Sequence, residues 1–332
     1  MTDANTSAHG GAEADAVTGS GGSGRRTNRE RPDDAVAALP PDASPLTSPP
    51  KPPPPKTVPM LGWNWLTTAR LLAAALVCGS AVLLFAIHTR PWGYIPLLVG
   101  VALAFAVDRR LGRDLALIAI AQAIISTISL RADLSDAGMA RFTVVLSLAV
   151  LVPWAVSRYV FGDRIIVFPV GTGKRWSRSQ WVYLGVVVAF GYLVLPIYFI
   201  GSGAYQNWPD LVGASDIGRL FIGVNAVGLW DELFFICVVF ALLRAHFPMW
   251  VANVFQATVF VSFLWELGYR EWGPALTIPF ALVQGWIFSW TKSLPYVVTV
   301  HLLFDAVVFG VLVHAHHPEL FDIFVTAPAV GS

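Results

Sequence analysis

Three strongly apolar stretches of this sequence carry ionisable side chains in their middles. Asp231 and Glu232 are adjacent in the first stretch, and Glu266 stands in the second. His301 and Asp305 are four residues apart in the third, so they share one face of a helix. Carboxylates and an imidazole can move protons, stabilise an oxyanion or bind a metal ion. Because such groups are expensive to bury in hydrocarbon-length helices, they are the candidate functional residues of the chain.

The composition predicts a membrane protein. The chain has 332 residues, of which 55% are hydrophobic and 13% are charged, and its mean hydropathy is +0.62. These values exclude a soluble domain. The two cysteines, Cys78 and Cys237, lie in apolar segments, which excludes a disulfide framework and a cysteine zinc site. The net charge of +1 says little about partners, and we expect the lipid bilayer as a partner and no nucleic acid.

The pattern of apolar runs divides the chain into four parts. Residues 1–59 are rich in Pro, Gly, Ala and Ser, which predicts a disordered cytoplasmic tail. N-terminal transmembrane helices are expected over 60–205, core helices with the ionisable residues over 206–315, and a C-terminal tail over 316–332. The predicted fold class is an all-α, polytopic membrane helix bundle of eight or nine spans.

Nine apolar runs are interpreted as membrane spans. They lie near Leu66–Ile87, Gly93–Val107, Leu115–Leu130, Phe142–Val160, Trp181–Ile200, Ile217–Leu243, Val251–Leu267, Ala275–Trp290 and Val297–Val313. Lys and Arg concentrate in alternate loops, on the side of the N-terminal tail. By the positive-inside rule this predicts a multi-pass protein of the plasma membrane with a cytoplasmic N-terminus. A re-entrant hairpin would reduce the count to eight.

The acids also have structural interpretations. Asp231 and Glu232 point about 100° apart on a helix, so we expect one to face the interior and the other to bond elsewhere. Both cannot remain charged near the middle of a bilayer without a cation or a shared proton. They could belong to a structural polar network with a partner such as Gln256. Glu266 could be an interfacial acid that pairs with Arg270.

The three stretches resemble the CPBP family of intramembrane proteases, also called CAAX proteases and bacteriocin-processing enzymes. That family carries EExxxR on one helix, FxxxH on a second, and HxxxN or HxxxD on a third. The third motif is intact here as His301 and Asp305. The resemblance covers about residues 217–309, and the order, spacing and apolar setting of the motifs agree with it.

The first two motifs depart from the family pattern. The first acidic position is Asp231, which is one methylene shorter than Glu. The Arg position is Ile236, so Glu232 lacks the cation with which it would be expected to pair. The FxxxH positions hold Ser262 and Glu266.

The resemblance implies an endopeptidase that hydrolyses membrane-associated protein or peptide substrates within the bilayer. Carried over, the catalytic residues would be Asp231, Glu232, Glu266, His301 and Asp305. Asp231 would activate water with Glu266, and His301 and Asp305 would support the oxyanion. If Asp231 and Glu266 share one proton, the enzyme is of a glutamic type without metal. The competing chemistry is a divalent metal such as zinc, held by Glu266, His301 and Asp305.

Two other classes of function remain open. One is a catalytically silent relative that acts as a membrane scaffold or binding protein, and the other is a proton-coupled transporter. A protease requires a water-accessible cavity at Asp231, Glu266 and His301. A scaffold would fill that space with aromatic rings such as Trp230 or Phe235. A transporter would show a continuous polar path through both leaflets.

Overall fold

The computed structural model describes residues 64–171, 175–320 and 322–329. These residues form helices joined by loops, with no strand among them. The predicted all-α membrane bundle is therefore confirmed. The tail predicted over 1–59 lies outside the described residues.

The helices follow one another in the order α1 to α10, with three π-helical segments and one 3-10 turn. They are α1 (Trp65–Ala81), η1 (Val82–Ala86), α2 (Arg90–Val107), α3 (Arg109–Ile125), α4 (Asp136–Ala155), η2 (Val156–Val160), α5 (Arg178–Phe199), η3 (Ala204–Asn207), α6 (Ala214–Asp231), η4 (Glu232–Phe240), α7 (Ala241–Arg244), α8 (Met249–Leu267), α9 (Pro274–Thr291) and α10 (Leu294–His316). The segments α6, η4 and α7 form one continuous helical run.

Each of the nine predicted spans falls on one helix or one continuous helical run. Seven of these, within the described residues, are long and apolar enough to cross a membrane. The other two are α3, with 17 residues, and α9, with 18. Both connect to their neighbours through short loops, which is typical of antiparallel helices in a bundle.

Polar residues placed at the helix ends explain where several helices begin. Asp108 ends α2 and caps α3, because its Oδ1 accepts a hydrogen bond from the backbone N–H of Arg110 at 2.9 Å. The Ser177 hydroxyl accepts from the N–H of Gln180, whose side chain accepts in return from the N–H of Ser177. This capping box fixes the start of α5.

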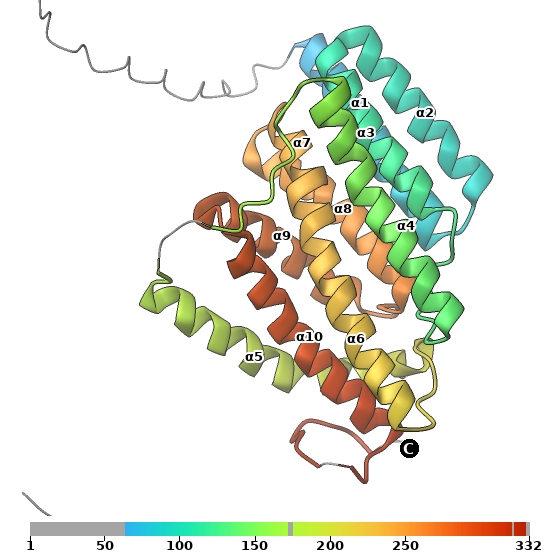
Figure 1. The fold of residues 1–332 in the computed structure, drawn as a ribbon, viewed down its shortest axis with the longest axis vertical. Helices are drawn as coiled ribbons and strands as arrows, with labels where there is room; N and C mark the ends of the chain where they lie inside the picture. The colour runs from blue at the N-terminus through green and yellow to red at the C-terminus, as the bar shows by residue number, and fades with distance from the viewer. Residues whose placement is uncertain (1–63, 172–174, 321, 330–332) are drawn as a thin grey trace, which may run out of the picture. The chain divides into compact units, whose positions relative to one another are not determined.

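The core helices pack between the N-terminal helices and α5 (Figure 1). Helices α1, α2 and α3 pack on one another, and α1 with η1 packs against α8. Helix α8 also packs against α9 and η4, and α10 packs against α6. Helix α5 crosses α10 on the other side. This arrangement buries η4 and the face of α10 that carries His301 and Asp305.

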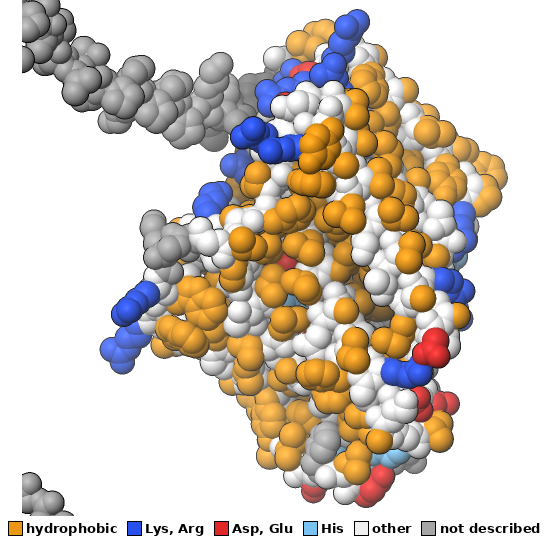
Figure 2. All heavy atoms as spheres, viewed as in Figure 1, with side chains coloured by type: hydrophobic (Ala, Val, Ile, Leu, Met, Phe, Trp, Pro, Cys, Tyr) orange, Lys and Arg blue, Asp and Glu red, His pale blue; other side chains and the backbone are white. Residues whose placement is uncertain are grey.

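The charged side chains lie mainly at the helix ends, with a hydrophobic band between them (Figure 2). Arg109, Arg110 and Arg113 begin α3, and Arg244 ends α7 at the same end of the bundle. Many of the large apolar side chains between the ends are exposed, as a lipid-facing surface requires. The chain is therefore a multi-pass membrane protein.

Candidate active site

The continuous helix of α6 and η4 brings two acids to the centre of the bundle. Asp231 is the last residue of α6, and Glu232 is the first of the π-helical segment η4. Each is 2% exposed. A π-helical turn contains an extra residue, and such turns often occur at functional sites.

His301 of α10 is the centre of the cluster. Its Nδ1 lies 2.7 Å from Oε1 of Glu232, which is hydrogen-bonding distance. Its Nε2 lies 3.6 Å from Oδ2 of Asp231 and 3.9 Å from Oδ2 of Asp305. Because an ionised carboxylate only accepts, we assign the Nδ1 proton as the donor to Glu232. The other nitrogen then faces the two aspartates.

The structure therefore brings together four of the five predicted site residues. The expectation that only one of Asp231 and Glu232 would face the interior is corrected, because both reach His301. They do so on opposite nitrogens of one ring, so they need not point the same way. His301 also takes the place of the cation that Ile236 cannot supply, and the Ile236 side chain is buried among apolar neighbours.

Gln284 of α9 is a site residue that the motifs did not identify. Its Nε2 donates to Oε1 of Glu232 at 2.8 Å and to the carbonyl of Val297 at 3.2 Å. Glu232 therefore accepts from both an imidazole and an amide. The signal in the sequence was a lone polar residue in an otherwise apolar run. Gln256, the partner considered for the acids, instead contacts Asn253 and a backbone carbonyl.

Gly228 makes room for Asp305. A Cβ at position 228 would overlap Oδ2 of Asp305 and would come within 3.3 Å of Cδ2 of His301. The carboxylate of Asp305 therefore rests directly against the backbone of α6. Its Oδ2 has no hydrogen-bond partner among the described residues, and the same holds for Oδ1 of Asp231. A buried oxygen without a protein partner has a specific cause, such as a catalytic role, a bound water or local strain.

Glu266 belongs to a different contact. Its Oε1 accepts a hydrogen bond from the backbone N–H of Leu130 at 2.9 Å, and Nδ1 of His88 lies 3.6 Å away. No hydrogen bond or ion pair links it to Asp231 or His301 in the described part of the chain. The predicted Asp231–Glu266 dyad is therefore not formed. The predicted pairing with Arg270 is not formed either.

The position of Glu266 also decides whether the predicted metal site of Glu266, His301 and Asp305 can form. Among the described residues, no three His, Cys, Asp or Glu side chains are arranged to hold a metal ion. Glu266 contacts the loop between α3 and α4. His301 and Asp305 belong to α10 and lie beside the end of α6 and the start of η4. The three predicted ligands therefore do not form one site.

The rotation of α8 about its own axis explains why Glu266 does not reach Asp231 or His301. Phe260, Leu264 and Leu267 of α8 line the central cavity, and these positions share one helix face. Glu266 is about 100° from Leu267 and so lies on another face. Phe260 and Leu264 have the FxxxH spacing, with Leu in place of His. The wall that α8 gives to the cavity is thus apolar.

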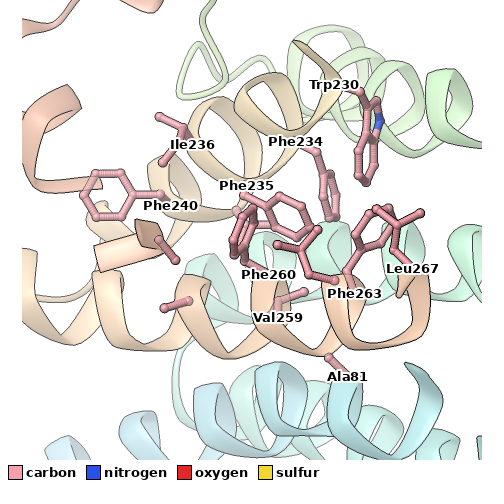
Figure 3. Packing of buried hydrophobic residues seen from close by; sticks show 14 of the residues in the cluster. Ala81, Trp230, Phe234, Phe235, Ile236, Phe240, Val259, Phe260, Phe263 and Leu267 are labelled. Carbon is pink, nitrogen blue, oxygen red and sulfur yellow. The ribbon is translucent and has the colours of Figure 1, made fainter. Parts of the chain in front are cut away.

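The cavity has a volume of about 240 Å³ and is lined by Asp231, His301 and Asp305. Its walls come from α4, α6, α8, α9 and α10, and from the loop between α3 and α4. In Figure 3, Trp230 packs with Phe234 and other rings of the hydrophobic core. Its Nε1 donates to the carbonyl of Leu146 at 2.7 Å. The aromatic rings therefore border the cavity and do not fill it.

Asp133 lies where the α3–α4 loop borders the cavity. Hydrogen bonds from Ser135 lower the pKa of Asp133 below its ordinary value, and the nearby guanidinium of Arg141 lowers it further. The Arg141 nitrogen is 2.8 Å from Oδ2 of Asp133. This end of the cavity therefore carries an ionised carboxylate that is already paired.

The fold and the site together define a multi-pass membrane protein with a buried acid–histidine cluster beside a cavity. Residues 213–307 match a family model described as type II CAAX prenyl endopeptidase, Rce1-like. The match supports the predicted resemblance of this region to the CPBP intramembrane proteases. At the level of the family it supports an intramembrane endopeptidase of the CAAX type and does not favour the catalytically silent alternative. Comparisons with curated proteins and with solved structures give no match.

The crowding at Gly228 generates the first prediction. Gly228→Ala should lower the free energy of unfolding in detergent by about 1–3 kcal/mol, because the added methyl group displaces Asp305. Gly218→Ala in the same helix is the matched control, since a Cβ there meets no atom within 4 Å. That control should be neutral or stabilising by up to about 1 kcal/mol. Equal effects of the two substitutions on thermal unfolding would contradict the placement of Asp305.

The position of Glu266 generates a second prediction. Glu266→Gln keeps an oxygen that can accept from Leu130, so peptide cleavage should stay within about threefold of the wild-type rate. Glu266→Leu leaves the buried N–H of Leu130 without a partner and should cost about 1–3 kcal/mol of stability. Rate assays and thermal unfolding of both variants distinguish a structural role of Glu266 from a catalytic one. If Glu266→Gln abolished cleavage in a folded protein, Glu266 would have to act at the reacting bond.

Proposed function

We propose that this protein is an intramembrane endopeptidase that hydrolyses peptide bonds of membrane-associated proteins or peptides, with Asp231 as the general base. The observation that carries the proposal is the convergence of Asp231, Asp305 and His301 on one cavity inside the bundle. All three side chains are at least nine-tenths buried. Ionisable groups in such a setting are functional candidates because their burial is otherwise unfavourable.

The reaction uses Asp231 as the base and His301 as the hydrogen-bond donor. Asp231 removes a proton from water, whose oxygen bonds to the carbonyl carbon of the peptide while the carbonyl π electrons move to oxygen. In this scheme His301 is protonated on both ring nitrogens, so that Nδ1–H donates to Glu232 and Nε2–H donates a hydrogen bond to the resulting oxyanion. When the C–N bond breaks, the proton held by Asp231 passes to the leaving amine. The products are one carboxylic acid and one amine, so water is the only co-reactant.

Glu232 and Gln284 are positioning residues in this scheme. The Glu232 carboxylate fixes the Nδ1 side of His301 at 2.7 Å, so that Nε2 faces the cavity. Gln284 holds the same carboxylate oxygen from the side of α9. Asp305 lies 3.9 Å from Nε2 and offers a second carboxylate for a protonated imidazole.

The path of the substrate follows from the lining of the cavity. The cavity is bordered by the α3–α4 loop and by Tyr269, which both lie at the opposite end of the bundle from Arg109 and Arg110. With a cytoplasmic N-terminus in the plasma membrane, that end faces outward. A peptide would reach Asp231 from this side or laterally, between α4 and α6. The apolar lining suits a substrate that partitions into the bilayer.

The test of this function is cleavage by the purified protein in lipid vesicles. The probes are fluorogenic peptides with a CAAX ending, with and without a farnesyl group, and an apolar transmembrane peptide. The wild type should cleave at least one probe, and Asp231→Asn should reduce the rate by about 10²–10⁴-fold. Asp322→Asn makes the same change at an exposed acid and should retain the wild-type rate. An Asp231→Asn protein that cleaves as fast as this control would refute the assignment of the base.

A further inference from the structure

Tyr269 is a cavity residue that no motif includes. It follows α8 directly and borders the same cavity as Asp231, His301 and Asp305. The residue is 7% exposed. Its hydroxyl has no hydrogen-bond partner among the residues that the structure describes, although buried tyrosine hydroxyls usually have one. A tyrosine hydroxyl that has no protein partner, in a residue that lines a cavity, can donate a hydrogen bond to a bound ligand.

The position of the ring is set by the turn that ends α8. Gly268 has a φ of 142°, which L-residues with a side chain rarely adopt. A Cβ there would also lie 2.8 Å from Nε1 of Trp208. The turn lets the N–H of Tyr269 donate to the carbonyl of Leu264 at 2.9 Å. The chain therefore folds back on α8, which keeps Tyr269 close to the cavity.

Aromatic packing holds the ring in place. The Tyr269 ring stacks on Tyr198 with centroids 6.4 Å apart, and it meets Phe199 and Trp208 edge to face at 5.6 and 5.8 Å. Three rings from α5 and the following loop thus fix one tyrosine, so little rotamer freedom is lost when a ligand binds. The hydroxyl is the polar end of an otherwise apolar packing unit.

The surroundings keep this hydroxyl in the form that donates. Burial raises the pKa of Tyr269 well above its ordinary value, and the carboxyl groups of Asp305 and Asp231 raise it further. A neutral phenol can donate one hydrogen bond. The same carboxyl groups are those that the proposed function uses.

The cavity also lacks a second donor on the side of α8. The oxyanion of a peptide addition intermediate is normally stabilised by more than one preorganised donor. His301 supplies one through Nε2, but Phe260, Leu264 and Leu267 make the α8 wall apolar. Tyr269 stands at the end of that wall and is the next donor along the chain.

We propose that Tyr269 is a further catalytic residue, whose hydroxyl donates a second hydrogen bond to the carbonyl oxygen of the scissile peptide as it becomes an oxyanion. This inference rests on the proposed endopeptidase function. The donated bond is stronger in the transition state than in the bound substrate, so it raises kcat and leaves KM nearly unchanged.

The test compares Tyr269→Phe with Tyr205→Phe and Asp231→Asn in lipid vesicles, with the same fluorogenic peptides. Tyr205 makes the matched control, because it is a partly buried tyrosine outside the cavity whose ring packs on His316. Tyr269→Phe should lower kcat by about 10²–10³-fold with KM within about threefold. Tyr205→Phe should retain the wild-type kcat. The melting temperatures of the two Phe variants in detergent should be similar.

The outcomes separate the two proposals. Active wild type, inactive Asp231→Asn and fully active Tyr269→Phe would overturn the role of Tyr269 alone. A wild type that cleaves none of the probes would overturn both. A rise in KM without a fall in kcat would assign Tyr269 to substrate binding and overturn catalysis by it.

A second substitution covers the case in which Tyr269→Phe does not fold. Incorporation of 3-fluorotyrosine at position 269 keeps the ring and the hydroxyl but makes the phenol a stronger hydrogen-bond donor. A donor to the oxyanion predicts a changed kcat at neutral pH with unchanged KM. An unchanged kcat in this folded protein would overturn the proposal.

Discussion

The contact between His301 and Glu232 is the interaction on which the rest of the site depends. Inside a helix bundle in hydrocarbon, a carboxylate cannot rely on water and must find its donors in the protein. His301 provides one donor to Glu232 at 2.7 Å, and Gln284 provides another at 2.8 Å. The ring held in this way presents its other nitrogen to Asp231 and the cavity. The chemistry proposed for the site needs that orientation of the imidazole.

Several features of the fold support the cluster around the contact between His301 and Glu232. Asp231 and Glu232, at the junction of α6 and η4, contact opposite nitrogens of the His301 ring. Gly228 lets Asp305 approach the backbone of α6 closely enough to join the cluster. The large aromatic residues of the core pack on one another (Figure 3), and a cavity lined by Asp231, His301 and Asp305 remains beside them. An open cavity beside buried, incompletely bonded acids fits an enzyme of the matched family better than a scaffold.

The sequence predicts the helices well because an apolar run of about 20 residues matches the thickness of a bilayer and rarely occurs in a soluble domain. It also predicts four residues of the cluster, because buried charge is costly and therefore conspicuous. The role of Glu266 could not be predicted, since it depends on how far α8 is rotated about its own axis. Gly228 is one of 28 glycines, and only the approach of Asp305 sets it apart. Tyr269 reaches the cavity through the turn at Gly268, which no spacing rule reveals.

The most direct test of the account is a double-mutant cycle between Glu232 and His301. The free energy of unfolding in detergent would be measured for wild type, Glu232→Gln, His301→Gln and the double variant. A direct buried contact predicts a coupling energy of about 1–3 kcal/mol, so the double variant should lose much less stability than the sum of the single variants. Single effects that add to within about 0.5 kcal/mol would show that the two side chains do not interact, and would contradict the account.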